Sequence, residues 1–199
     1  MIKKNKKIKF SAGMTYIELI VVLSIFSIMT SVVLFNYGKF QAKVDIKNLA
    51  SEVALKIVEA QKKAMSGNLP PTGGYGANWK PSYGLFFDRT ADDKSFIYFT
   101  DLNNNAFYDG GNGCISECLN QMSITKGNFM SKITVIGVGA SCSNITNLNI
   151  VFTRPNSGAI MKTNQAGCSA ISYAEVAVSS PQSVTALIKI YDSGRIQIN

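Results

Sequence analysis

The chain has 199 residues, of which 46% are hydrophobic, so it is long enough to bury a core of its own. Its formal net charge is +8, but five lysines lie within the first nine residues, and from Met14 onward 15 basic residues face 12 acidic ones. Positive charge concentrated at the N-terminus is typical of a membrane-topology signal and disfavours a DNA-binding surface. The chain has no histidine, which removes the commonest general base and the usual serine and cysteine triads, so we predict no enzyme.

An apolar segment, residues 14–35, follows the lysines, and Glu18 is its only charged residue. A helix of these 22 residues would be about 33 Å long, which is enough to cross a bilayer. Lysines on its N-terminal side predict a single span in the inner membrane, with the N-terminus in the cytoplasm and the C-terminal domain outside it. The small residues Ala12 and Gly13 precede the apolar segment, so cleavage there would leave the helix on the mature protein.

Residues 13–18 (GMTYIE), behind a short lysine-rich leader, resemble the class III signal of type IV pilins and pseudopilins. The resemblance implies that a prepilin peptidase removes residues 1–13 by cutting after Gly13, and that Met14 becomes an N-methylated N-terminus. It also implies that Thr15 and Glu18 serve filament assembly. Glu18 would pair with the amine of Met14 on a neighbouring subunit, because a charge buried among apolar helices is costly unless an opposite charge matches it. The alternative is an ordinary signal anchor with an incidental glutamate.

The helical pattern continues beyond the apolar segment. Apolar residues recur at intervals of three and four over residues 46–64, and lysines occupy the opposite side. Gly67 and the prolines after it end the pattern. We therefore predict one helix over about residues 15–66, with residues 36–66 as its amphipathic second half. Any melting between the two halves would have to use Gly38.

Residues 67–199 are predicted to form a β-rich globular domain, because short β-branched or aromatic runs alternate there with Gly, Asn, Ser and Pro clusters. The predicted strands are 83–87, 96–100, 133–138, 148–152, one that follows the turn at 155–158, 174–178, 184–191 and 196–198. Asp192, Ser193 and Gly194 predict a hairpin between the last two. The expected fold class is α+β, with a long N-terminal helix packed on an antiparallel β domain.

The C-terminal half resembles the GspH/FimT group of minor pilins and pseudopilins in residues 147–158 (NLNIVFTRPNSG) and 188–198 (IKIYDSGRIQI). The resemblance implies a type IV pilin-like fold and a structural role as a minor pilin or pseudopilin of a type IV pilus or a type II secretion pseudopilus. The implied partners are the prepilin peptidase, other pilin or pseudopilin subunits and the membrane.

A surface or tip subunit that binds DNA or a receptor is the alternative function. Binding of DNA would require a basic stripe with interleaved aromatic residues. The basic residues that could contribute are scattered along the sequence: Arg154, Lys162, Lys189 and Arg195. This scatter weakens the hypothesis that nucleic acid is a partner.

Residues 101–109 (DLNNNAFYD) place oxygen atoms in the order of a calcium-binding loop. The ligands would be four side chains and one main-chain carbonyl, from Asp101, Asn103, Asn105, Asp109 and Phe107 respectively. Ala106 replaces the usual glycine and Asn112 the closing glutamate, so the expected affinity is weak, on the order of 10⁻⁴–10⁻³ M. The alternative is an Asx-rich turn without a cofactor, whose side chains bond their own backbone.

Four cysteines lie on the side that is predicted to be outside the cytoplasm, where an even number of cysteines indicates disulfides. They are Cys114, Cys118, Cys142 and Cys168. The sequence allows three pairings, and proximity along the chain favours Cys114 with Cys118 and Cys142 with Cys168. A four-cysteine zinc site is the alternative, which an oxidising compartment disfavours.

Overall fold

A computed structural model describes residues 13–70, 76, 78–111, 113–137, 140–168 and 170–199. The chain divides into two compact units, Met1–Phe40 and Gln41–Asn199. One helix, α1 (Tyr16–Ser66), contributes residues to both units and is continuous through Gly38. The prediction of one long helix over residues 15–66 is therefore confirmed to within one residue.

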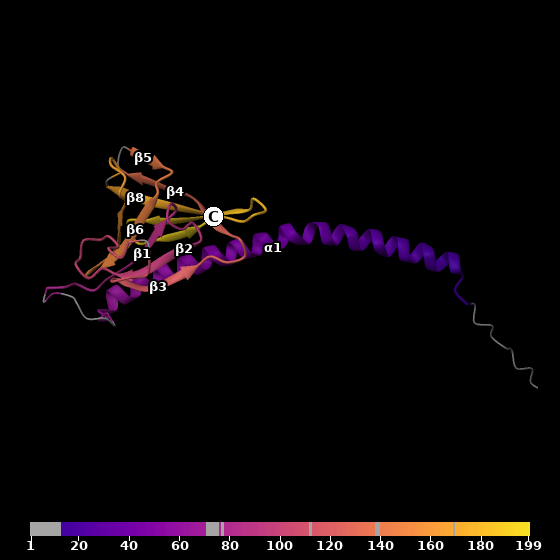
Figure 1. Cartoon of the computed structure of the whole chain (residues 1–199), viewed down its shortest axis with the longest axis horizontal. Coiled ribbons are helices and arrows are strands. Elements are labelled where there is room, and N and C mark those ends of the chain that lie inside the picture. The colour runs from indigo at the N-terminus through magenta and orange to yellow at the C-terminus, as the bar shows by residue number, and fades with distance from the viewer. Residues whose placement is uncertain (1–12, 71–75, 77, 112, 138–139, 169) are drawn as a thin grey trace, which may run out of the picture. The chain divides into compact units, whose positions relative to one another are not determined.

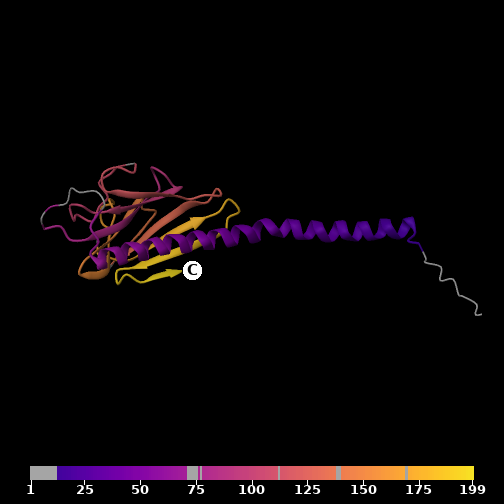
Figure 2. The same cartoon turned by 90° about the horizontal axis from the view of Figure 1, so that it is seen from below.

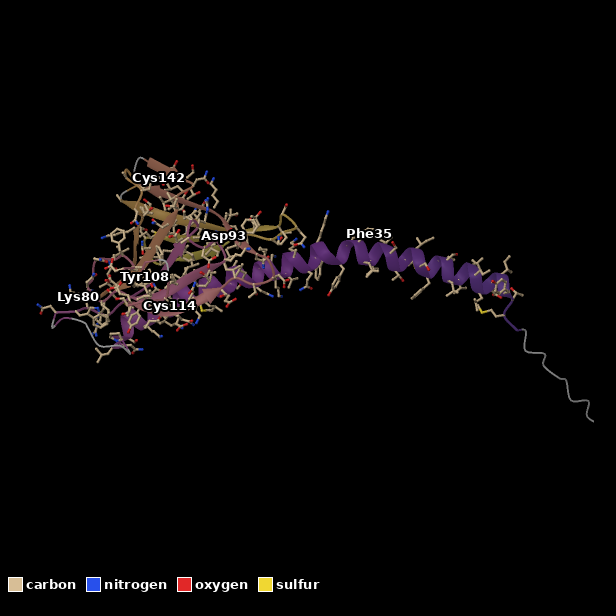
Figure 3. The ribbon with its side chains drawn as sticks, in the orientation of Figure 1. Phe35, Lys80, Asp93, Tyr108, Cys114 and Cys142 are labelled. Carbon is tan, nitrogen blue, oxygen red and sulfur yellow. A yellow bond between two sulfur atoms is a disulfide. The ribbon has the colours of Figure 1, made fainter. Side chains whose placement is uncertain are left out.

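The part of α1 in the first unit, residues 16–40, exposes every side chain. Phe35, which Figure 3 labels on the helix, is 83% exposed. The helix is long and apolar enough to cross a membrane. Three of its hydroxyl groups are paired within the helix, since Ser24, Ser27 and Thr30 each donate a 2.8 Å hydrogen bond to a carbonyl one turn earlier. Polar side chains paired in this way are compatible with an apolar environment.

The second unit contains two five-stranded antiparallel sheets (Figure 1). Sheet A has the order β3-β2-β1-β6-β7, with bounds Cys118–Ser123, Ser95–Thr100, Ser82–Asp88, Asn147–Thr153 and Asn156–Lys162. Sheet B has the order β10-β9-β8-β4-β5, with bounds Ile196–Ile198, Thr185–Tyr191, Ile171–Ser179, Phe129–Gly137 and Ala140–Ser143.

All eight predicted strands are present, although Val138, the predicted end of one, lies outside the described residues. Gly194 has φ +82° in the turn between β9 and β10, a backbone conformation that glycine adopts without strain, so the predicted hairpin is confirmed. The sequence analysis missed β3 and β5. Both are edge strands, and polar or small residues dominate them, so neither has the apolar pattern of a strand.

The main core of the second unit lies between the inner faces of the sheets and the apolar stripe of α1. The stripe consists of Ala42, Ile46, Leu49, Ala50, Val53, Ile57, Ala60 and Ala64, all of them buried. Figure 2 shows this part of α1 running beside the C-terminal strands, and α1 shares a groove there with Ile198 and Asn199. The predicted amphipathic pattern of residues 36–66 is therefore confirmed over the buried stripe.

The outer face of sheet A carries a second, smaller core under the segment that follows β2. Ala106 and Tyr108 of this segment pack there against Ile97, Phe99 and Val151. All six residues of β2 are buried as a result, because both faces of the strand are covered. This packing fixes the 101–109 loop on the surface of sheet A.

Candidate functional site

The predicted processing site lies immediately before α1. Gly13 and Met14 are exposed and precede the helix. Thr15 caps the helix, because its hydroxyl accepts a 3.3 Å hydrogen bond from the main-chain N–H of Glu18. Thr15 and Glu18 thus have the spacing of a capping box, which the sequence analysis did not recognise although Thr-x-x-Glu is its signal. Residues 1–12 of the predicted leader lie outside the described residues.

Glu18 lies in the first turn of α1, where a negative charge interacts favourably with the helix dipole. The residue is exposed. Within the described part of the chain, no lysine or arginine forms an ion pair with its carboxylate.

The predicted calcium loop is anchored by Asp101, which is 1% exposed. Its two carboxylate oxygens accept hydrogen bonds from the main-chain N–H groups of Asn105 (3.1 Å) and Ala106 (2.8 Å). Burial raises the pKa of the Asp101 carboxyl, and these N–H groups oppose that shift. The loop thus folds around a carboxylate at its first position, as a calcium-binding loop does.

The other predicted ligands are bonded to one another and to the loop backbone. The amide groups of Asn103 and Asn105 donate to the same carboxylate oxygen of Asp109, at 2.7 and 2.8 Å. The side-chain oxygen of Asn103 accepts from the N–H of Asn105, and that of Asn105 from the N–H of Phe107. These are the bonds expected of an Asx-rich turn, and calcium binding stays a prediction.

Ala106 has φ +63°, although it stands where a calcium loop carries glycine. The loop therefore bends at this position without a glycine. The left-handed conformation is unfavourable for alanine, and burial of its methyl group against Phe99 and Tyr108 offsets part of that cost.

Glu117 is a site residue that the sequence analysis missed. It is 3% exposed, and its two carboxylate oxygens accept from the N–H groups of Leu102 (2.8 Å) and Asp109 (3.1 Å), so it joins both ends of the loop. Burial also raises its pKa. The calcium-loop pattern places its closing ligand at position 112, where the sequence has Asn112, and this residue lies outside the described residues. Glu117 stands eight residues after Asp109, which is beyond the spacing of a standard calcium-binding loop, so the loop pattern did not indicate it.

The structure pairs Cys114 with Cys118 and Cys142 with Cys168, and no cysteine is free. Figure 3 labels Cys114 and Cys142. The favoured pairing is therefore present, and the zinc alternative is wrong because no thiolate is left to bind a metal. The first disulfide closes the turn that carries Glu117.

Two of the four basic residues considered for DNA binding lie together. The Lys189 ammonium is 3.7 Å from the ring centre of Tyr173, and the Arg195 guanidinium is 4.0 Å from that of Tyr191. The two tyrosines are opposite one another on β8 and β9. Lys162 instead donates to the carbonyl of Asn105 beside the loop. Lys189 and Arg195 thus lie together in space although the four basic residues are scattered in the sequence, because neighbouring antiparallel strands bring distant residues together.

Arg154 does not join this cluster, since it follows β6 and lies beside Gly67 at the end of α1.

Among the described residues, no group of three or more acidic, cysteine or histidine side chains could hold a metal ion. Comparisons with protein-family models, with curated proteins and with solved structures found no match.

Proposed function

We propose that this protein is a minor pilin or pseudopilin, a structural subunit that assembles into a type IV pilus or a type II secretion pseudopilus. The observation that carries the proposal is a helix that begins two residues after Met14 and exposes its whole apolar first part. A fully exposed apolar helix requires a membrane or other helices around it. The glycine before Met14 and the single glutamate in this segment agree with the processing signal of pilins.

The same helix would serve two environments in turn. In the inner membrane it would hold the precursor as a single span, with residues 1–13 in the cytoplasm and the β-rich unit outside. After prepilin peptidase has cut behind Gly13, the exposed apolar surface would pack against the helices of neighbouring subunits. Glu18 would then match the amine of Met14 on a neighbour, which would set the axial position of one subunit relative to the next.

Processing provides the first test. The protein is expressed with and without a prepilin peptidase, and the N-terminus is read by mass spectrometry. We expect a mature N-terminus at methylated Met14 only when the peptidase is present, and an uncut precursor in Gly13→Asp. An intact leader in the presence of active peptidase, or cleavage after the apolar segment, would overturn the proposal.

Assembly provides the second test, with two variants of Glu18. Glu18→Gln keeps the size of the side chain and removes its charge, whereas Glu18→Ala removes both. Each should insert and be cleaved, yet enter filaments poorly, since a buried amine left unpaired costs several kcal/mol. Quantitative recovery of tagged subunits from sheared filaments measures entry. Wild-type recovery of Glu18→Gln would show that charge pairing is not required.

The cluster of Lys189, Arg195 and the two tyrosines favours a second candidate function, a surface subunit that binds DNA. In proteins that bind single-stranded DNA, cations contact the phosphates and aromatic rings stack on the bases, so a cluster of both is suited to this ligand. Fluorescence anisotropy with labelled single-stranded DNA tests this. Arg195→Ala should weaken binding and lower the salt dependence by about one counterion, whereas Lys132→Ala, an exposed lysine on β4, should not. Equal binding of DNA by the Arg195→Ala and Lys132→Ala variants would exclude this surface as the DNA-binding site.

A further inference from the structure

A cleft of about 330 Å³ lies on the outer face of sheet A beside the 101–109 loop. Two cross-strand pairs of β1 and β6 contribute to it, Phe86 opposite Asn149 and Asp88 opposite Asn147. Residues 107–109 of the loop add further lining, with Tyr108 (labelled in Figure 3) in contact with the ring of Phe86. None of the residues in this cleft belongs to the predicted processing signal or to the basic cluster on sheet B.

Two asparagines in the cleft are held in defined orientations. Asn149 is 1% exposed, and its side-chain oxygen accepts a 2.9 Å hydrogen bond from the N–H of Tyr108. The side-chain oxygen of Asn147 accepts a 3.0 Å bond from the N–H of Asn164. Because both oxygens face N–H donors, the remaining groups are the two amide NH₂ groups, which have no hydrogen-bond acceptor among the described residues.

Two carboxylates complement these donors. One oxygen of Asp88 accepts from the N–H groups of Thr90 (2.8 Å) and Ala91 (3.1 Å), and one oxygen of Asp109 accepts from two asparagine amides. Within the described part of the chain, the second oxygen of each carboxylate has no hydrogen-bond donor. The cleft therefore combines two NH₂ donors, two carboxylate acceptors and the half-buried aromatic residues Phe86 and Phe107.

We propose that this cleft binds a neutral carbohydrate. A sugar hydroxyl both donates and accepts hydrogen bonds, so a pair of hydroxyls can use a carboxylate and an amide NH₂ together. Two carboxylates disfavour an anion, and the amide hydrogens disfavour a bare metal ion, which requires oxygen ligands. The aromatic rings would cover the apolar C–H face of the sugar ring. The inference does not rest on the filament proposal, because every residue involved lies in the second unit.

Saturation-transfer NMR on the full chain, in micelles of dodecylphosphocholine, tests the proposal. This detergent has no sugar head group to compete. The probes are glucose, galactose, mannose and N-acetylglucosamine at about 10 mM, a concentration at which millimolar binding is detected. We expect saturation transfer to at least one of them. Transfer to none, or transfer only to glucuronate or ethylamine in the same assay, would overturn the proposal.

Asn149→Asp is the decisive variant, since it keeps the oxygen that accepts from Tyr108 and replaces the NH₂ donor by a carboxylate oxygen. It should weaken sugar binding about tenfold or more. Asn156→Asp is the matched control, because it makes the same change at the first residue of β7, opposite Thr153 at the far end of β6, where the asparagine oxygen accepts from the N–H of Gly158. If Asn149→Asp does not fold, Asp88→Asn replaces an acceptor of the cleft by a donor. Unchanged binding in the folded variant would contradict the assignment.

Discussion

Asp101 and Glu117 are buried carboxylates whose oxygens are held by main-chain N–H groups. Burial outweighs these bonds and raises the pKa of both carboxyls in the folded protein. A group whose folded pKa is raised binds protons more tightly in the native state. Its contribution to stability is therefore complete below the unfolded pKa and is lost as the pH rises through the folded pKa.

Glu117→Gln should accordingly reduce the loss of stability as the pH rises above the ordinary pKa of a glutamate, because one of the two groups responsible no longer titrates. Glu59→Gln is a control of opposite sign. The pKa of Glu59 is lowered, chiefly by its hydrogen bond from Lys56, so its contribution is present above the unfolded pKa and lost as the pH falls. Urea unfolding at several pH values, followed by fluorescence of the single tryptophan, measures both slopes. Parallel slopes in wild type and Glu117→Gln would contradict the prediction.

The predicted calcium loop has a spectroscopic reporter, because the indole N–H of Trp79 donates a 2.7 Å hydrogen bond to the carbonyl of Asp101. If calcium binds only the folded protein, it should stabilise it by about 1.4 kcal/mol at ten times Kd. Millimolar calcium should then raise the melting temperature relative to chelator. Magnesium, which requires a tighter octahedral shell, should act poorly.

Asp109→Asn should abolish this shift, since it removes an exposed carboxylate of the loop and keeps the size of the side chain. Asp92→Asn makes the same change in a turn outside the loop, where the carboxylate accepts from Lys94, and should retain the shift. Identical melts of the wild-type protein with calcium and with chelator would mean that the loop is an Asx-rich turn alone.

The second part of α1 has two faces that should respond differently to substitution. Ile57 is fully buried between the helix and the sheets, whereas Leu55, on the same helix, is 69% exposed. Ile57→Ala should lower the free energy of unfolding by about 2–5 kcal/mol, because it removes apolar contacts and leaves a cavity.

Leu55→Ala should change the stability of the isolated subunit by no more than about 0.5 kcal/mol. Urea unfolding of both variants in detergent compares them. Equal destabilisation by the two variants would contradict the prediction. It would mean that Leu55 is also buried in solution, against another part of the protein or another molecule.

The two disulfides constrain the whole second unit to different extents. Cys142 and Cys168 are 26 residues apart and tie the edge strand β5 to the segment between β7 and β8, whereas Cys114 and Cys118 are four residues apart. Loop-closure entropy predicts that replacing the long-range pair by serine costs about 3.5 kcal/mol and the short-range pair about 2 kcal/mol. Thermal melts of the two double variants test this order, and a larger loss from the short-range pair would show that it does more than restrict the unfolded chain.

The sequence by itself determined the features that depend on local pattern. The length of α1, the position of most strands and the turn at Gly194 follow from periodicity and from the conformational freedom of glycine, which neighbours in sequence establish. Proximity in sequence likewise predicted the disulfide pairing. The edge strands β3 and β5 could not be predicted in this way, because their side chains are mostly not buried and do not alternate between apolar and polar residues.

Only the tertiary structure decided which distant residues meet. Glu117 closes the 101–109 loop because a disulfide-bonded turn returns the chain to both of its ends, a path that no spacing rule encodes. Asn149 and Asp109 meet in one cleft because the loop folds back over sheet A, where its apolar residues complete the second core. Register and loop packing are set by burial across the whole unit, and burial depends on contacts between segments that are far apart in the sequence.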